Sequence, residues 1–365
     1  MSLLSGERNK FNLREEDTHV NYIAVDCHIS SLDFAVVNDT GELLKSNRAA
    51  TSVNNLIGFV KSVPRPRQVY IEEGALAAWV LETCVQYGEK VVITDPKRNR
   101  WIGSSGEKDD AIDKFKLAQL ARGGYIKEIH HPVGQRRRFR ELMEAYHDTV
   151  RSTTRIKNKI KAEFRHNGIQ CTGTTVYLEA YRQQWKQKLP QDATLLLILD
   201  GLWRQLELSE QTEKELLAAA KIQAKQYPEI KRFKALPGIG FIHAATVSAI
   251  LETPHRFANK RKVWMYAGLG IMKRSSGGKL YTEKLTTDYN RLLKYTVKQA
   301  AGAAIRDTHS NPFRRKYLDM TLSGIAPHRA RLTVARDMLA TMWAMWKKGE
   351  KYNPEIREKA SHKQG

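Results

Sequence analysis

The spacing of apolar residues divides the chain into three stretches. Between Asn21 and about His131, short apolar runs with strand-like alternation are interleaved with segments of helical spacing. The predicted strands cover residues 21–28, 32–39, 41–50, 68–73 and 89–96, and the predicted helices cover 52–63, 75–87 and 109–123. Three strands in succession, followed by strand–helix–strand–helix, predict an antiparallel meander extended by parallel strands, the order typical of RNase H-like folds.

From about Val133 to Tyr227 the spacing becomes that of long helices. Residues 136–168 form one strongly basic helical pattern, and a second pattern covers about 194–226. Two long helices with polar outer faces and a loop between them predict an antiparallel hairpin or coiled-coil arm. The arm is either a plain spacer or a nucleic-acid contact, and the density of Arg and Lys favours contact at least equally. The cations chosen as candidate contacts are Arg136, Arg137, Arg138, Arg155 and Lys159.

The stretch from about Ile230 onward is predicted to be mainly helical. The sequence LPGIG at 236–240, just before an apolar helix, is similar to the hairpin of helix–hairpin–helix DNA-binding modules. In such hairpins the backbone N–H groups at a helix N-terminus hold a phosphate, which makes Gly238 and Gly240 candidate contacts. Plain packing is the alternative interpretation of this turn. Further helices are predicted over 288–307 and 328–349.

The charge of the chain points to a polyanionic partner. It has 61 Lys and Arg against 39 Asp and Glu, a formal net charge of +22 and a pI of about 9.8. Such a field concentrates nucleic acid, and each neutralised phosphate releases counterions. The three cysteines are far apart and lack CxxC spacing, so a zinc site or a disulfide framework is not expected and a reducing cytoplasm fits. No signal peptide and no apolar run of about 18 residues is present, which predicts a soluble protein without a membrane partner.

Acidic residues stand where phosphodiester chemistry with metal ions would need them. Such chemistry requires several carboxylates that converge on divalent ions. Asp26 lies in the first predicted strand, where a carboxylate among apolar residues is costly unless it is paired or binds metal. A cap at the strand end is the alternative. Glu72 and Glu73 follow the fourth predicted strand and point to opposite faces, so only one can reach the same ion. Glu72 is favoured, with Glu73 as the alternate.

The remaining pair is expected on the helix after the fifth strand. Within KDDAIDKFKLA, Asp110 and Asp113 are three residues apart and share a helical face, while Asp109 is suited to cap the helix. Mg²⁺ prefers such hard oxygen ligands and keeps waters, so a few carboxylates suffice. Mn²⁺ is the alternative ion.

A polar loop carries a second candidate centre. Ser275 and Ser276 precede two glycines, with Lys273 and Arg274 before them and Lys279 after. A serine becomes a nucleophile for phosphoryl transfer when nearby cations stabilise the pentavalent phosphate and an acceptor takes its proton. The alternative is a flexible basic loop that only contacts DNA phosphates, and the residue types taken alone favour this interpretation. The accessory candidates are His243, His255 and Tyr281.

Taken together, these motifs resemble the DEDD insertion-sequence transposases related to the invertase Piv, the IS110 family, also called bridge-RNA-guided recombinases. The motifs that carry the resemblance are VDCH, a strand-end Glu, KDDAIDKFKLAQLARGGYI, LPGIG, YAGLG, the SSGGK loop and the NRLLK helix, between residues 21 and 350. The chain departs from the family pattern at Val25, where a Gly is usual, and at 287–290, where TDYN replaces Lys-x-Gly-Asn.

The resemblance implies a mechanism with two halves. Asp26, Glu72, Asp110 and Asp113 would be the DEDD metal site, and the nucleophile would be Ser276, with Ser275 as the fallback. The serine would form a covalent 5′-phosphoserine intermediate with donor and target double-stranded DNA. A structured non-coding guide RNA would pair with both DNAs. Composite sites would require a homo-oligomer, a dimer that assembles to a tetramer, in the bacterial cytoplasm or nucleoid.

We therefore expect an α/β plus α fold with an RNase H-like (RuvC-like) N-terminal domain, a coiled-coil arm and a helical serine-nucleophile domain. The predicted segments are the tail 1–20, the DEDD domain 21–132, the arm 133–228, the transposase domain 229–350 and the tail 351–365. A DNA recombinase is favoured over two alternatives. One is a Holliday-junction-type nuclease that uses only the carboxylates, and the other is a non-catalytic nucleic-acid-binding protein.

Overall fold

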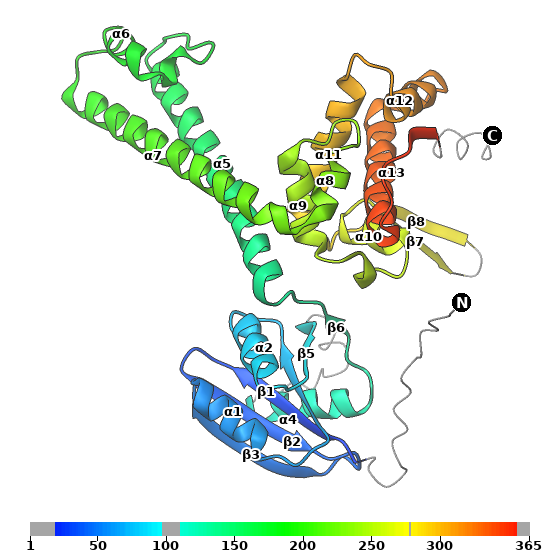
Figure 1. Cartoon of the computed structure of the whole chain (residues 1–365). Helices are drawn as coiled ribbons and strands as arrows, with labels where there is room; N and C mark the ends of the chain where they lie inside the picture. Colours follow the sequence, from blue (N-terminus) through cyan, green and yellow to red (C-terminus); the bar gives the residue numbers. More distant parts are fainter. Residues whose placement is uncertain (1–18, 97–109, 277–278, 356–365) are drawn as a thin grey trace, which may run out of the picture. The chain divides into compact units, whose positions relative to one another are not determined.

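In the computed structural model the chain divides into two compact units, Met1–Gly134 and Gln135–Gly365 (Figure 1). The structure describes residues 19–96, 110–276 and 279–355, without the side chains of 110–113, 273–276 and 279–282. The first unit is a mixed α/β domain with a central sheet, and the second is almost entirely helical. The predicted mixed architecture with a helical C-terminal part is confirmed. Within the described residues, no helix has the length and apolar character needed to cross a membrane.

The sheet of the first unit has the strand order β3-β2-β1-β4-β5-β6. Its strands are β1 (Asn21–Cys27), β2 (Ser31–Val37), β3 (Leu43–Ala50), β4 (Arg67–Glu72), β5 (Val91–Thr94) and β6 (Glu128–Ile129). The first three strands pair antiparallel, and β4 and β5 then continue the sheet in parallel with β1. The meander extended by parallel strands is therefore as the pattern predicts. The short antiparallel strand β6 is an addition that two residues of sequence could not reveal.

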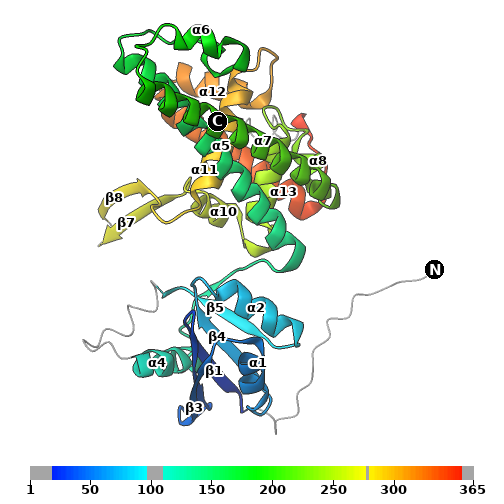
Figure 2. The same ribbon diagram turned by 90° about the vertical axis from the view of Figure 1, so that its left-hand side faces the viewer.

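Helices cover both faces of this sheet. In Figure 2, α1 (Val53–Lys61) and α2 (Ala77–Gln86) lie on one side and α4 (Asp110–Arg122) lies on the other. Side chains alternate between two cores because successive residues of a strand point to opposite faces. Val25, Phe34 and Ile71 pack in the core that includes α1 and α2. Ala24 and Tyr70 pack in the core that includes α4.

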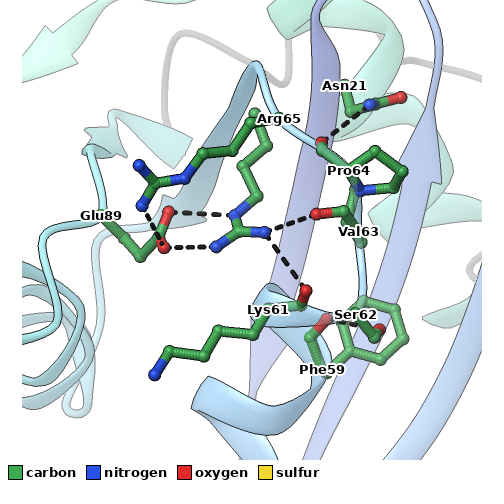
Figure 3. Close-up of polar contacts among 9 residues, drawn as sticks. Asn21, Phe59, Lys61, Ser62, Val63, Pro64, Arg65 and Glu89 are labelled. Atoms are coloured by element: carbon green, nitrogen blue, oxygen red, sulfur yellow. Dashed lines mark hydrogen bonds and ion pairs between the residues drawn. The ribbon is translucent and has the colours of Figure 1, made fainter.

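A buried ion-pair network closes the N-terminal edge of β4. The Glu89 carboxylate accepts hydrogen bonds of 3.0 Å from Arg65 and from Nε of Arg67 (Figure 3). Arg67 also donates to the carbonyl oxygens of Lys61 and Val63, which tie the end of α1 to the strand. The hydrogen bonds from Arg67, supported by Arg65, hold the pKa of Glu89 below its usual value. This network therefore fixes the start of β4. Glu72 lies at the other end of the same strand, next to Asp26 of β1.

The second unit begins with a long helical hairpin. Helix α5 (Gly134–His166) and helix α7 (Ala193–Gln223) run antiparallel, with α6 (Arg182–Lys186) near the far end (Figure 1). Two 3₁₀ turns, η1 (Thr175–Tyr177) and η2 (Glu179–Tyr181), complete that end. Its small core contains Phe164, Trp185 and Trp203, and the Trp203 indole N–H donates to the Val176 carbonyl oxygen at 2.9 Å. The sequence placed both long helices correctly.

The other end of the hairpin enters the main core of the second unit. Phe139, Met143 and Tyr146 of α5 pack there with the C-terminal helices. These helices are α8 (Pro228–Phe233), α9 (Phe241–Leu251), α10 (Lys260–Tyr266), α11 (Arg291–Arg306), α12 (Pro312–Leu322) and α13 (Pro327–Lys348), joined by the turns η3 (Ala224–Gln226) and η4 (Pro254–Arg256). Helix α12 had not been predicted, because its apolar positions are few and only Phe313 is buried.

The segment predicted as a polar loop is a β-hairpin. Strands β7 (Ile271–Ser276) and β8 (Lys279–Leu285) pair antiparallel and extend from the helices, as Figure 2 shows. Only the two glycines between them separate Ser276 from Lys279. Gly-Gly is a preferred two-residue hairpin connection because both positions need positive φ angles in type I′ turns. The prediction of a loop over the whole segment was therefore wrong for its flanks.

Candidate active site

The carboxylates predicted in the first unit meet at one end of the sheet. Val25 of β1 pairs with Ile71 of β4 in parallel register, so Asp26 and Glu72 occupy the next positions on adjacent strands. Because Val25 and Ile71 face α1 and α2, the alternation of side chains directs Asp26 and Glu72 to the opposite face, which α4 covers. The structure thus brings together two of the four predicted metal ligands.

Two further polar residues extend this row across the sheet. Asp33 of β2 stands directly opposite Asp26 in the antiparallel register, and Thr94 of β5 stands opposite Glu72. Both lie on the same face, because their neighbours Phe34 and Ile93 pack in the core with α1 and α2. The face under α4 therefore carries Asp33, Asp26, Glu72 and Thr94 on four adjacent strands.

Asp33 is a residue that the sequence reasoning missed. It is buried and pairs with Lys114 Nζ at 3.3 Å and with Arg48 Nε at 3.5 Å. Lys114 lies on α4 directly after Asp113, so this ion pair anchors the helix that carries the two remaining predicted ligands. The available signal was an aspartate with apolar neighbours on both sides within the strand SLDFAVV.

Helix α4 begins at Asp110, close to the predicted start. The side chains of Asp110 and Asp113 lie outside the described residues, as does Asp109. The backbone of α4 packs on β1 and β2, on the face that carries Asp26. The helix therefore lies on the same face of the sheet as Asp26 and Glu72. The role of Asp110 and Asp113 as metal ligands stays a prediction.

Glu73, the alternate ligand, has different surroundings. Its carboxylate forms an ion pair with His131, and its backbone N–H donates to the Thr94 carbonyl oxygen at 3.0 Å. As the next residue along the chain it points away from the row that contains Glu72. The preference for Glu72 over Glu73 as the ligand on β4 stays a prediction.

The donor set at this edge suits a hard divalent cation. The carboxylates of Asp26 and Glu72 are oxygen ligands of the kind Mg²⁺ prefers, and His28 Nε2 lies 3.2 Å from Asp26 Oδ2. Burial, followed by the neighbouring Asp26 carboxylate, raises the pKa of the Cys27 thiol to about 12, so it offers no thiolate at neutral pH. Among the side chains that the structure describes, no three His, Cys, Asp or Glu residues form a metal cluster. The two further ligands predicted from the sequence, Asp110 and Asp113, have side chains outside the described residues.

The predicted nucleophile stands at the tip of the β7–β8 hairpin. Ser276 pairs with Lys279 and Ser275 with Leu280, and the register shifts between Arg274 and Ser275. The side chains of both serines, and those of Lys273, Arg274, Lys279 and Tyr281, lie outside the described residues. The backbone thus places the two candidate serines beside the connecting glycines.

Comparison with known families assigns both units. Residues 23–165 match the DEDD transposase family model of the IS110 type, whose description is "Transposase", and residues 230–318 match the "Transposase IS116/IS110/IS902 family". The chain belongs to the IS110 family of transposases. The resemblance found in its motifs is thereby confirmed, and the protein is an enzyme that recombines DNA. The family implies DNA binding and suggests the use of a divalent metal ion.

Two curated relatives are similar to this transposase. The transposase for insertion sequence element IS1111A of Coxiella burnetii (strain RSA 493 / Nine Mile phase I) is 20% identical over 248 residues, covering 67% of this chain and 68% of the relative. The insertion element IS110 uncharacterized 43.6 kDa protein of Streptomyces coelicolor (strain ATCC BAA-471 / A3(2) / M145) is 25% identical over 169 residues, covering 46% and 41%.

In the transposase, the base of the hairpin is fixed by close backbone packing. The sequence YAGLG at 266–270 precedes β7. Gly268 has φ +66°, and a Cβ on it would lie 2.5 Å from the Tyr289 ring. Arg336 of α13 donates from Nε to the Leu269 carbonyl oxygen at 2.6 Å, and Thr286 N–H donates to Gly270 at 3.0 Å. A side chain at position 268 would therefore displace the segment that carries the hairpin.

The LPGIG turn of the transposase combines packing with an open helix end. Gly238 has φ +78°, and a Cβ there would lie 2.5 Å from both the Ala300 carbonyl oxygen and the Ala304 nitrogen of α11. Gly240 is the N-cap of α9 and has open space around it. Packing therefore accounts for Gly238, and the phosphate contacts proposed for both glycines stay predictions.

The predicted accessory histidines differ in their surroundings. His243 is half-buried, and its Nδ1 is 3.2 Å from the Gly238 carbonyl oxygen. Burial lowers the pKa of His243. His255 lies in the turn η4, is exposed, and has its backbone N–H capped by Thr253 at 3.3 Å. Neither residue belongs to the hairpin, and their accessory role stays a prediction.

The basic residues chosen on α5 fall into two groups. Arg136 pairs with the buried Glu229 at 2.8 Å and stacks on Tyr227 with 3.9 Å to the ring centroid, so its charge is already neutralised inside the unit. Arg137 and Arg138 both pair with Glu141, at 3.2 and 3.0 Å. Arg155 and Lys159 are exposed and form no ion pair with any side chain that the structure describes. These last two are the more available for a nucleic acid.

Proposed function

We propose that this transposase cuts and rejoins donor and target DNA through a serine nucleophile, Ser276, assisted by a divalent-cation site of Asp26, Glu72, Asp110 and Asp113. The observation that carries the proposal is the row of polar side chains at the strand ends, on the sheet face against which α4 packs, in a chain whose residues 23–165 match the DEDD transposases. The hairpin supports the second half, because it presents Ser276 next to two glycines and three cations.

The proposed step is a displacement at phosphorus. The Ser276 oxygen forms a bond to a DNA phosphorus atom, and the bond from that atom to the 3′-oxygen breaks. The proton of the serine hydroxyl leaves, and the departing 3′-oxygen gains one, so that a 5′-phosphoserine and a free 3′-hydroxyl result. Attack by a 3′-hydroxyl on the phosphoserine reverses the same exchange and rejoins the strand.

The chain supplies charge stabilisation from two sides. Lys273, Arg274 and Lys279 flank the serines and would bind the phosphate whose charge rises in the transition state. A divalent cation, Mg²⁺ or in its place Mn²⁺, would supply a Lewis acid when bound to the carboxylates. Asp33 and Lys114 act through α4, because their ion pair holds that helix against the sheet.

The wider assembly in this proposal includes RNA and further copies of the chain. A net charge of +22 suits a large polyanionic partner, and the exposed Arg155 and Lys159 of α5 give it a surface. We propose a structured guide RNA that pairs with both DNAs, and a dimer that assembles to a tetramer. The five segments predicted from the sequence remain part of the proposal, with the arm at 133–228 and the serine domain at 229–350.

The deciding experiment traps the covalent intermediate. The full chain, with its co-purified RNA and Mg²⁺, is incubated with cognate DNA, and the products are resolved on a denaturing gel and mapped as peptides. We expect an adduct on Ser276 that is absent from Ser276→Ala. Ser275→Ala is the matched control, because it removes a hydroxyl one residue away and should retain the adduct.

Each other outcome identifies a different enzyme. An adduct that Ser275→Ala removes and Ser276→Ala retains would transfer the role of nucleophile to Ser275. Cleaved DNA without any adduct, unaffected by Ser276→Ala, would contradict the proposal and leave a nuclease that uses the carboxylates alone. RNase treatment before the reaction tests the guide RNA, since loss of recombination with retained folding is expected.

A further inference from the structure

A pocket of about 560 Å³ lies at the base of the serine hairpin. Both hairpin strands contribute to it, together with the end of α12 and the first turns of α13. Its volume falls within the range typical of small-ligand sites. The pocket lies entirely within the second unit, and neither the carboxylates of the sheet nor the candidate serines line it.

The lining combines an apolar wall with a cationic rim. The apolar residues are Ile271, Leu285, Met320, Ile325 and Leu332. Lys284, Arg329 and Arg336 oppose a single carboxylate, Glu283, which leaves a net charge of +2 with His328 neutral. A free phosphate would need only the cations, whereas a purely apolar ligand would need none of them.

The cations of the rim differ in how firmly they are held. Arg336 is half-buried, and its Nε bond to the Leu269 carbonyl oxygen fixes the guanidinium where it lines the pocket. Arg329 and His328 are exposed in the first turn of α13 and form no ion pair with a described side chain. The residue before this turn, Ala326, caps no N–H group with its side chain, so the helix end adds positive potential to the same rim.

We propose that this pocket holds one unpaired nucleotide of the bound nucleic acid, with the base against the apolar wall and a phosphate at Arg329 and Arg336. The inference rests on the proposed function in taking nucleic acid as the partner. Unpaired bases are recognised by burial of their faces and by cations along the backbone. Ile271 lines the pocket and Ser276 lies five residues further along the strand, about 17 Å away at the usual rise per residue. A strand anchored here is therefore held a few nucleotides from the proposed nucleophile.

The test measures binding rather than chemistry. Fluorescein-labelled single-stranded DNA and single-stranded RNA of one sequence, and the corresponding DNA duplex, are titrated with the full chain and followed by anisotropy. The variants are Arg329→Ala and Arg331→Ala. Arg331 is exposed on the same helix, two residues further along and outside the pocket, so its variant removes the same charge.

We expect Arg329→Ala to weaken single-strand binding about tenfold, and Arg331→Ala about twofold or less. The arm that shows the larger loss, DNA or RNA, identifies the source of the nucleotide. Equal losses for the two variants, or a loss on the duplex as large as on the single strands, would overturn the pocket. An iodouracil-substituted oligonucleotide should crosslink to Met320 or His328 on irradiation, and crosslinks confined to other peptides would also overturn it.

The two proposals fail separately. If the pocket binds no nucleotide, the phosphoserine adduct is still expected, because the trapping assay reports on Ser276. Conversely, absence of an adduct leaves the difference between Arg329→Ala and Arg331→Ala intact, because binding needs no cleavage.

Discussion

The sheet edge and the serine hairpin place reactive groups by different physical means. At the sheet edge, strand register and side-chain alternation bring Asp26, Asp33 and Glu72 to one face, although Glu72 is distant in sequence from the other two. The hairpin instead depends on close packing around it, such as that of the Gly268 backbone against the Tyr289 ring. The first arrangement depends on strand pairing and on the ion pair that holds α4, whereas the second can be lost through a single added methyl group some distance from the serine.

The largest expected effect is the loss of activity when a predicted metal ligand at the sheet edge is changed, compared with a change at a neighbouring carboxylate. Asp26→Asn removes a charged oxygen ligand, and we expect recombination to fall by about 10²- to 10³-fold, as for loss of one group that stabilises transition-state charge. Glu73→Gln changes the adjacent alternate on the other face and should retain most activity. Initial rates on cognate DNA with saturating Mg²⁺ provide the measurement. Equal losses would place the ligand on β4 at Glu73.

The second prediction concerns the packing of the second unit, which carries the β7–β8 hairpin. Gly238→Ala adds a methyl group against the α11 backbone at a positive φ angle, and should lower the free energy of unfolding by about 3 kcal/mol. Gly240→Ala is the matched control, because its Cβ enters open space. Urea unfolding of both variants measures the difference. Similar midpoints would show that the turn is as tolerant as the sheet edge.

The third prediction tests whether Asp33 and Lys114 position α4. Lys114→Met leaves the buried Asp33 carboxylate without its partner on the helix, so we expect a roughly tenfold higher Mg²⁺ concentration at half-maximal activity. Lys114→Arg retains the charge and should largely restore the wild-type value. A merely structural pair would lower stability without moving the Mg²⁺ dependence. The double variant with Asp33→Asn should be more stable than Lys114→Met alone.

Most of the first unit could be predicted from sequence because its strands alternate or run fully apolar between clear turns. The alternation also shows that Glu72 and Glu73 point to opposite faces, and the preference for Glu72 as the ligand stays a prediction. Asp33 was missed because its burial follows from coverage of both sheet faces, and one strand does not show that α4 lies above it.

In the second unit the long helices of the arm could be predicted from the sequence, but the surroundings of the serines could not. The Gly-Gly pair at 277–278 was a hairpin signal that the polar composition obscured. The contact of Gly238 with α11 joins segments about sixty residues apart, and no local pattern encodes it. The engagement of Arg136 by Glu229 was hidden for the same reason, since it pairs α5 with a helix 93 residues later.

The smallest expected effect distinguishes the two units by acid sensitivity. His147 of α5 is buried, with Nε2 2.8 Å from the Thr246 hydroxyl of α9, and burial followed by the nearby Arg151 and His243 lowers its pKa from 6.5 to about 4. Between these values the unfolded chain binds the proton more readily, so stability falls as the pH drops through this window and changes no further below it. Glu89 in the first unit behaves differently, because its lowered pKa preserves its contribution until the pH falls below 4.5.

At about pH 5 the second unit should therefore have lost roughly 2 kcal/mol relative to pH 7, while the Glu89 network still contributes fully. His147→Gln retains a hydrogen-bonding group toward Thr246 without a titrating ring, and should remove most of this slope. His255→Gln is the control, because that histidine is exposed. Urea unfolding at the two pH values, with the units distinguished by proteolytic fragments, provides the measurement. If His147→Gln loses as much stability between pH 7 and pH 5 as the wild type, the buried histidine does not determine the acid sensitivity of the second unit.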